Sequence, residues 1–439
     1  MAHYGVLRQR ASNSSVAGRA NPSNEKVFIV SSIYDPNGAL TGGAWGQTVL
    51  DLIDILGPTN VFLSVYENDP SELAEASLDD FRRAVHCNAS VISEHISMDS
   101  LPKATLPSGE ERVRRIAFLA EVRNRALRPL DDENSPASKT QFDKLLFLND
   151  VIFNPVEAAQ LLFSTNVDAA GKADYRAACA VDFINPFKFY DTYATRDLEG
   201  YGVGLPFYPW FSSEGDAASR RDVLAQKDAV RVRSCWGGMV AFDAKWFQQI
   251  PRPSKSAIST TTSKTPLRFT YDHELYWDSS ECCLINAQLQ TLDPSSLADS
   301  ETGIFMNPFV RVAYDENTFR WLPLVRRIER TFSWIHGVLT SIIGVRFNYR
   351  RTEEPGDAVS HYEWDPANDA SKKSSFEMRN DMDSVSGNWK LVQTTAGVGG
   401  FCGIEQMLLL GDGEDGHPRW ENAWMPEKPL LARLPVPQI

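Results

Sequence analysis

The sequence predicts an α/β protein built on an open, Rossmann-like and largely parallel sheet flanked by helices. From Lys26 onward, apolar runs of strand length alternate with amphipathic stretches of helix length, which is the pattern of a mainly parallel sheet. The contents of 43% hydrophobic and 23% charged residues are those of a globular protein with a large buried core. At 439 residues the chain allows one large elaborated domain or two smaller ones.

The first predicted elements carry clear start and stop signals. Gly57-Pro58 ends one helix, and Asp69-Pro70-Ser71-Glu72 predicts the start of another, with Asp69 as its N-cap. The elements expected in this part are, in order, a strand at 27–31, a helix at 45–56, a strand at 61–66, a helix after residue 69 and a strand at 91–92.

The second half of the expected sheet is less regular. The elements expected there are a helix at 112–127, a strand at 142–148, a strand at 176–181, an irregular aromatic region at 187–211, a strand pair at 231–242 interrupted by two glycines, and a strand at 308–314. We expect an exposed loop at 254–265, a buried helix at 334–345, an irregular polar stretch at 352–389, and packed segments at 397–403 and 407–410.

The strand at 142–148 runs directly into two polar residues, Asn149 and Asp150. Open α/β sheets bind ligands at the carboxyl ends of their strands, and a hard divalent cation prefers oxygen ligands that it can share with a diphosphate. Both residues are therefore predicted metal ligands, although Asn and Asp also end strands as ordinary turn residues. Asn154, followed by Pro155 and Glu157, predicts the N-cap of the next helix.

Asp278 and Glu281 form a carboxylate pair at a predicted helix start. The spacing favours a capping box, in which Asp278 caps the helix and Glu281 reaches back to its amide. Alternatively, one carboxylate faces a sugar hydroxyl or a developing glycosyl cation, and both are predicted catalytic residues on that interpretation. A pair of carboxylates is also what a glycosidase uses.

Several other polar or small residues are predicted to bind substrate. The guanidinium groups of the arginines next to Asn124 suit hydrogen bonds to a diphosphate or to ribose hydroxyls. Alternatively, these arginines lie on a solvated helix face, and backbone groups make the hydrogen bonds of Asn124. For the glycine pair at 237–238, the alternative to substrate binding is a tight strand bend. For Arg196, the alternative is a simple ion pair. The predicted substrate-binding residues are Ser31 and Tyr34 beside the loop 35–43, Arg123, Asn124, Asp182, Arg196, Trp236, Gly237 and Gly238.

Other chemistries lack their motifs. The chain has no Gly-x-Ser-x-Gly elbow, no Walker loop, no dinucleotide glycine motif after the first strand and no histidine pair with metal spacing. The net charge of −13 argues against nucleic acid or an anionic membrane covering the whole surface. No apolar run reaches the roughly 18 residues that span a bilayer, and residues 1–24 are expected to be a flexible stem.

Eight motifs in one order resemble the fungal capsule-associated α-1,3-mannosyltransferases of glycosyltransferase family 69, over about residues 26–403. They are IAFLAEVRNRAL at 116–127, FLNDV at 147–151, ACAVDF at 178–183, YDT at 190–192 with RD at 196–197, SCWGG at 234–238, SECCL at 280–284, NPFVRVAY at 307–314 and GGFCG at 399–403. The family commonly has Asp-x-Asp where this chain has Asn149-Asp150-Val151, so Asp150 is the one carboxylate expected to hold a metal.

The resemblance implies a GT-A-like fold with a C-terminal extension, GDP-mannose as donor, an α-mannoside as acceptor, Mn²⁺ (or Mg²⁺) as cofactor and retention of configuration. It also implies a type II membrane protein of the Golgi lumen whose anchor is absent from this chain. The expected domains are a stem at 1–24, a catalytic domain at 25–330 and a C-terminal segment at 331–439 packed on it. The alternatives are a non-catalytic mannan-binding protein and a glycosidase.

Overall fold

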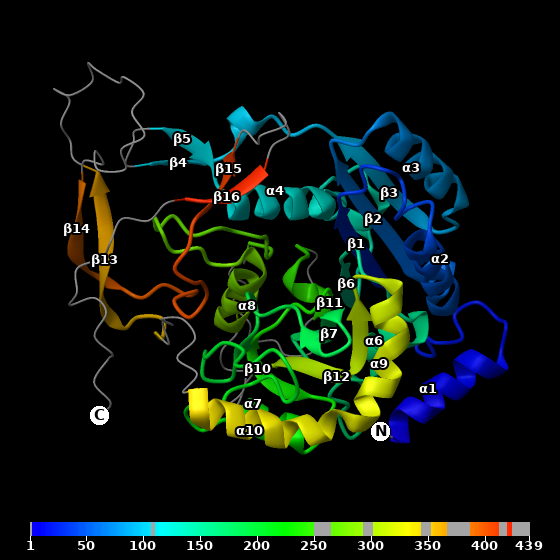
Figure 1. Cartoon of the computed structure of the whole chain (residues 1–439). Helices are drawn as coiled ribbons and strands as arrows, with labels where there is room; N and C mark the ends of the chain where they lie inside the picture. The colour runs from blue at the N-terminus through cyan, green and yellow to red at the C-terminus, as the bar shows by residue number, and fades with distance from the viewer. Residues whose placement is uncertain are drawn as a thin grey trace, which may run out of the picture.

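A central twisted sheet organises the computed structural model, which describes residues 2–106, 110–249, 265–292, 302–343, 353–366, 387–411 and 419–423 (Figure 1). Its strands follow the order β3-β2-β1-β6-β11-β7-β12-β10-β9, with β8 beside β7. Their bounds are β1 Val27–Ile33, β2 Val61–Asn68, β3 Asn88–Glu94, β6 Lys144–Leu148, β7 Ala177–Asn185, β8 Lys188–Phe189, β9 Arg196–Asp197, β10 Val230–Ser234, β11 Met239–Asp243 and β12 Ile304–Ala313.

The sheet is mixed, with parallel and antiparallel pairs in about equal number among the described strands, and it confirms the predicted α/β class with an open sheet. Strand β1 pairs in parallel with both β2 and β6, β2 pairs with β3, and β7 pairs with β12. Strand β11 is antiparallel to β6 and β7, between which it lies. The expected pair at 231–242 therefore exists as two strands, but β10 pairs with β9 and β12 instead of with β11.

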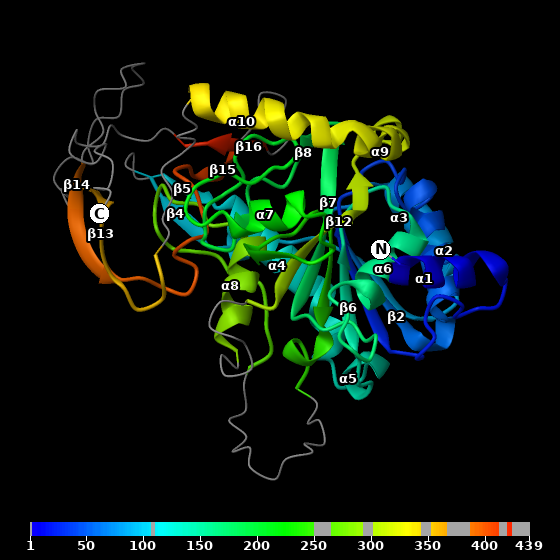
Figure 2. The same cartoon turned by 90° about the horizontal axis from the view of Figure 1, so that it is seen from below.

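Helices cover both faces of the sheet (Figures 1 and 2). Side chains of β1 alternate between two cores, because successive residues of a strand point to opposite faces. Val27 and Ile29 pack on the side of α2 and α6, whereas Phe28 and Val30 pack on the side of α4 and α8. The helices are α2 Ala44–Leu56, α3 Glu72–Ala84, α4 Arg115–Leu127, α5 Pro136–Lys139, α6 Pro155–Ser164, α7 Ala218–Leu224 and α8 Glu281–Thr291.

Two of the predicted helix signals hold, and the predicted N-cap of α3 does not. Gly57 ends α2 with a φ of 91°, and the Asn154 side chain accepts hydrogen bonds from the amides of Val156 and Glu157 at the start of α6. The N-cap of α3 is Ser71, whose side chain accepts from the amide of Ala74. The prediction of Asp69 as this cap is wrong because Asp69 lies two residues further from the helix, with a φ of 55°.

The N-terminal segment is ordered against the domain, so the prediction of a flexible stem is wrong for residues 2–24. Helix α1 (Ala2–Asn13) places Tyr4 and Leu7, one turn apart, in buried positions. The Tyr4 hydroxyl accepts a hydrogen bond of 2.6 Å from Asn307 Nδ2, and a His3 ring nitrogen contacts the Ser164 carbonyl.

The C-terminal segment contains two strand pairs, the first of which overlaps the irregular stretch expected at 352–389. Strands β13 (Ala358–Pro366) and β14 (Gly387–Thr395) pair with each other, as do β15 (Leu408–Gly411) and β16 (Arg419–Asn422). The short strands β4 (Lys103–Thr105) and β5 (Glu111–Val113) form a further hairpin. Buried Phe401, Cys402, Met407 and Leu409 confirm the predicted packed segments at 397–403 and 407–410. The expected loop at 254–265 lies outside the described residues up to residue 264.

Helices α9 (Glu316–Ile328) and α10 (Phe332–Ile343) follow β12 and run along the outside of the molecule (Figures 1 and 2). The expectation of a buried helix at 334–345 is wrong for α10, because Trp334 is 75% exposed and His336 is buried instead. None of the helices in the described ranges is long and apolar enough to cross a membrane.

Candidate active site

The candidate site lies at the carboxyl end of β6, where the loop that leads into β11 meets it. Asn149 and Asp150 follow β6, and residues 236–238 precede β11. The Asn149 amide donates a hydrogen bond of 2.9 Å to the Gly238 carbonyl. The structure therefore brings together two motifs that lie almost ninety residues apart in the sequence. The hydrogen bond between the side chains of Asn149 and Trp236, which are 87 residues apart, also joins these motifs.

Asn149 is held firmly by its neighbours. Its Oδ1 atom accepts hydrogen bonds from Trp236 Nε1 at 3.1 Å and from Arg123 Nη1 at 3.4 Å. Its main-chain carbonyl accepts a third from Trp45 Nε1 at 3.0 Å. A carbonyl oxygen has two acceptor lone pairs, so both lone pairs of Oδ1 are already in use. This geometry fixes the backbone from which Asp150 projects.

Arg123 lies at the centre of the site, in a cage of aromatic rings. Its guanidinium carbon is 4.5 Å from the ring centre of Trp236 and 5.2 Å from that of Phe147, and Phe269 completes the cage. Its Nε donates to Glu281 Oε1 at 2.9 Å. Burial acts to lower the pKa of Arg123, but the neighbouring thiol and Glu281 raise it overall. The arginine is therefore a buried, permanently charged group.

Glu281 and Asp278 do not form a capping box. Helix α8 begins at Glu281, its N-cap is Ser280, and no side chain caps it. Asp278 is fully buried, and its two oxygens accept from Arg114 Nη2 at 3.0 Å and from the amide of Leu408 at 2.7 Å. Burial raises the pKa of Asp278. The capping prediction is wrong because ion pairs with arginines distant in sequence outcompete the local hydrogen bonds.

Asp182 and Asp191 form a second acidic centre beside the loop that precedes β11. The Asp182 carboxylate accepts from the Asp191 amide and from the Tyr314 hydroxyl, each at 3.0 Å. Burial, reinforced by the Asp191 charge, raises the pKa of Asp182 to about 7. Asp191 Oδ2 in turn accepts from the amides of Trp236 at 3.0 Å and Gly237 at 3.2 Å. Asp191 thus fixes the loop that holds Asn149.

Sequence reasoning did not select Asp191 or Tyr314 as site residues. Both occur in motifs of the family resemblance, at 190–192 and 307–314, and that was the available signal. Tyr314 follows β12 directly, and the carboxyl end of β12 lies beside that of β7. Burial, together with the charges of Asp182 and Asp150, raises the pKa of Tyr314.

The loop requires glycine at two positions. Gly237 and Gly238 have φ angles of 60° and 68°, which L side chains rarely adopt. A Cβ atom on Gly237 would lie 2.0 Å from the Ala180 carbonyl oxygen, and one on Gly238 would lie 2.8 Å from Val151 Cγ1. The glycines let this loop approach β7 and the Asp150 segment closely.

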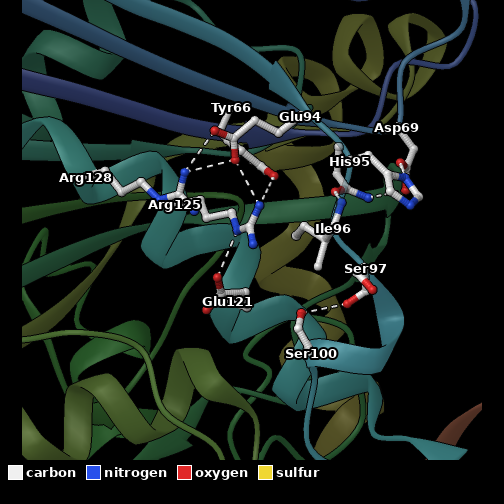
Figure 3. A network of polar contacts seen from close by, with 11 residues as sticks. Tyr66, Asp69, Glu94, His95, Ile96, Ser97, Ser100, Glu121, Arg125 and Arg128 are labelled. Carbon is white, nitrogen blue, oxygen red and sulfur yellow. Dashed lines mark hydrogen bonds and ion pairs between the residues drawn. The ribbon is translucent and has the colours of Figure 1, made fainter.

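A polar network and a pocket lie along α4. Arg125 donates to Glu121 at 2.8 Å, to Glu94 at 2.9 Å and to the Tyr66 hydroxyl at 3.2 Å (Figure 3). A pocket of about 520 Å³ adjoins this network. It is lined by Ser100, Leu101, Pro102, Ala117, Ala120, Glu121, Asn124, Arg125, Phe269, Thr270, Tyr271 and His273. Phe269 thus separates the pocket from Arg123.

Asn124 and Arg196 serve backbone segments. The Asn124 side chain donates to the Phe269 carbonyl at 2.9 Å and accepts from the Phe269 amide at 2.8 Å. This is the alternative in which backbone groups make the hydrogen bonds of Asn124. Buried Arg196 donates to the carbonyls of Tyr193, Thr195, Phe401 and Gly403. Their predicted contacts with substrate stay predictions.

Ser31 and Tyr34 differ in their exposure. Ser31 is 1% exposed, and its hydroxyl donates to the Leu148 carbonyl at 2.6 Å. Tyr34 is 69% exposed, next to the loop at 35–43. Of the two, Tyr34 is the one whose side chain can reach a ligand without rearrangement.

Asp150 is the exposed carboxylate of the site. Within the described residues it has no hydrogen bond or ion pair, and no group of three or more His, Cys, Asp or Glu side chains is arranged to hold a metal ion. A cation such as Mg²⁺ commonly takes one or two carboxylates together with substrate phosphates and waters. The single carboxylate fits that kind of shared site and does not fit an all-protein metal cage.

Residues 26–288 match a protein family described as Cryptococcal mannosyltransferase 1. No curated protein matches the chain. Mannosyltransferase PcManGT from Pyrobaculum calidifontis, solved in complex with GDP-Man and Mn²⁺, is 10% identical over 76% of this chain and 73% of its own, with a TM-score of 0.34. Glucosyl-3-phosphoglycerate synthase from Mycobacterium tuberculosis, solved with Mg²⁺ and uridine diphosphate, is 11% identical over 82% of this chain and 87% of its own, with a TM-score of 0.31.

Proposed function

Because this chain belongs to the Cryptococcal mannosyltransferase 1 family, we propose that it is a retaining α-1,3-mannosyltransferase with GDP-mannose as donor and an α-mannoside as acceptor. The bond between mannose C1 and the diphosphate oxygen breaks, and a bond from C1 to the acceptor 3-oxygen forms on the same face. The proton of the acceptor hydroxyl passes to the leaving diphosphate, so the reaction does not require a protein base.

The observation that carries the proposal is the exposed Asp150 carboxylate on a backbone that Asn149 clamps. Asp150 would hold Mn²⁺ or Mg²⁺ against the donor diphosphate, and the ion would neutralise the charge of that leaving group. We assign Asn149 to positioning, because Trp236 and Arg123 occupy both lone pairs of its oxygen. This assignment replaces the predicted role of Asn149 as a metal ligand.

Arg123 and Glu281 act on the site as a pair. Arg123 sets the positions of Asn149 and the Trp236 ring, and Glu281 orients Arg123. Glu281 is therefore a positioning residue in this proposal, and Asp278 supports the fold through Arg114. The pocket beside Phe269 has the size of ordinary ligand pockets, and we assign it to a substrate of the reaction.

Two alternatives fit the site less well. A glycosidase needs two carboxylates that can reach the scissile bond, whereas Asp278 and Glu281 are at most 2% exposed and both pair with arginines. A mannan-binding protein without activity has no need of an exposed acid beside so rigid a loop.

The proposed setting is the Golgi lumen, in capsule or cell-surface glycan synthesis. Two disulfides support an oxidising compartment. They join Cys179 to Cys235 and Cys283 to Cys402, and both lie in segments that surround the candidate site.

The test is transfer by the purified chain from GDP-mannose with Mn²⁺ to a mannose disaccharide, with assignment of the new linkage. We expect an α-1,3 bond, and a loss of at least about 100-fold in turnover for Asp150→Ala. GDP with Mn²⁺ should raise the melting temperature of the parent chain and not that of the variant. Asp80→Ala on α3, also an exposed aspartate, is the matched control. Near-normal transfer by Asp150→Ala would contradict the proposal.

A further inference from the structure

Helices α9 and α10 expose apolar side chains that would normally be buried. On α9 these residues are spaced by three and four, so they form one stripe along the helix. On α10 they occupy the outward side of the helix. The residues, which we call the α9–α10 face, are Trp321 (55% exposed), Leu324 (48%), Ile328 (49%), Trp334 (75%), Ile335 (41%) and Val338 (38%).

The opposite sides of both helices are anchored in the domain. Leu322 and Val325 of α9 are buried. On α10, His336 is fully buried, with Nδ1 at 3.1 Å from Arg220 Nη1, and the ring of Phe332 lies 5.7 Å from that of Phe187. The face is therefore held outward by the fold.

Basic residues border this apolar face. Arg327 and Arg330 are exposed, and within the described residues they make no ion pair, whereas the exposed Arg320 pairs with Glu316 at 3.0 Å. The nearby Glu329 turns inward and accepts from Arg311 at 2.8 Å. The chain as a whole carries a net charge of −13, so the sign of this region is opposite to that of the molecule.

We propose that the α9–α10 face docks on the surface of an anionic lipid membrane. Helices that lie in a membrane interface combine an apolar side with flanking arginines, tryptophan favours the headgroup region, and arginines attract anionic headgroups. The two helices lie along the outside of the molecule (Figures 1 and 2). A protein partner needs no excess of one charge around the apolar side chains, whereas an anionic lipid surface does.

The face continues toward the candidate site. Phe187 and Tyr190 are 49% and 48% exposed, and the Tyr190 ring lies 4.7 Å from that of Tyr314, whose hydroxyl donates to Asp182. Docking would therefore place the acidic centre beside the lipid surface. The inference goes beyond the proposed function and does not depend on it.

Sedimentation of the whole chain with lipid vesicles tests the proposal. We expect binding to vesicles of phosphatidylcholine with phosphatidylserine, weak binding to phosphatidylcholine alone, and release at about 0.5 M salt. Each arginine at an anionic surface is worth about five-fold in affinity, so Arg327→Gln with Arg330→Gln should weaken binding about 25-fold. Trp321→Ser with Trp334→Ser should abolish it.

Leu73→Ser with Arg83→Gln is the matched control, because both side chains are exposed on α3, and it should bind like the parent chain. Circular dichroism checks that each variant is folded, and Trp334→Ser alone replaces the double variant if that fails to fold. Absence of binding to anionic vesicles, or unchanged binding of both variants, would overturn the proposal. So would a concentration-dependent dimer that the tryptophan substitutions abolish while no vesicle binding is seen.

Discussion

The Arg123 guanidinium joins three segments that are far apart along the chain. It contacts Glu281 on α8, Asn149 after β6 and the Trp236 ring before β11. A buried charge is costly unless its partners are in place, so each of these residues depends on the others. A change in any one of them is expected to move Asp150.

Breaking the Arg123–Glu281 pair should destabilise the fold strongly. Glu281→Met leaves a buried guanidinium without its counter-charge, at a cost of about 3–5 kcal/mol in unfolding free energy, whereas Arg123→Met with Glu281→Met should cost less than the sum of Arg123→Met and Glu281→Met alone. Urea denaturation of both singles and the double measures this coupling.

A kinetic measurement and a control pair separate a positioning role of Glu281 from a purely structural one. Glu281→Gln should lower kcat for mannose transfer even at temperatures where the variant is fully folded. The exposed pair Arg320–Glu316, treated in the same way, should show a coupling within about 0.5 kcal/mol. Additive effects at Arg123 and Glu281 would contradict the arrangement.

At the scale of elements, cross-links hold the irregular segments that surround the site. The bond between Cys179 and Cys235 ties β7 to the loop before β11, and the bond between Cys283 and Cys402 ties α8 to the segment at 397–403. Arg196 adds hydrogen bonds from the other side, to Phe401 and Gly403. The cross-links make these segments rigid, as hydrogen bonding between strands does in the sheet.

Loss of the bond between Cys283 and Cys402 should therefore destabilise the chain. The bond spans 119 residues, and closing so long a loop removes unfolded-state entropy worth about 5 kcal/mol. Cys283→Ser with Cys402→Ser should lower the urea midpoint accordingly, while Cys87→Ser, which removes a free thiol, should leave it nearly unchanged. Equal midpoints for the parent chain and the double variant under oxidising conditions would refute this expectation.

Local patterns predicted some elements and missed others. The strand β6 and the helix α2 were predicted because their apolar residues are continuous or periodic over enough residues. The hairpin of β13 and β14 was missed, since its exposed, polar residues carry little hydrophobic pattern. Its order depends on pairing between strands and on contacts such as that between the Trp364 and Trp389 rings, which a local window does not contain.

At the scale of the whole molecule, one buried acid should make stability depend on pH. Glu67 on β2 is 1% exposed, and its Oε1 accepts from the Asp35 amide at 3.2 Å. Within the described residues its Oε2 is buried without a partner. Burial, together with the charges of Asp35 and Glu75, raises the pKa of Glu67 to about 7 against the lowering effect of the hydrogen bond from the Asp35 amide.

A carboxyl whose pKa is raised in the folded state favours folding while it is protonated. Between pH 4.5 and about 7 the unfolded chain has already released this proton, so the free energy of unfolding falls as pH rises through that window, by up to about 3 kcal/mol. Urea denaturation across the window should show a smaller slope for Glu67→Gln. Part of the slope should remain in this variant, because the pKa of Asp182 is also raised. An unchanged slope in the variant would rule out this role of Glu67.

The sequence by itself determined the α/β class, most strands and helices of the sheet, the place of Asp150 at the end of β6, and the family. Those features depend on hydrophobic periodicity and short motifs, which are local along the chain. Only the tertiary structure decided that Glu281 pairs with Arg123, 158 residues away, that Asp278 is no helix cap, and that α10 turns its apolar side outward. The partner of a buried charge and the exposure of a helix face depend on which segments the fold brings together, and the order of residues does not contain that information locally.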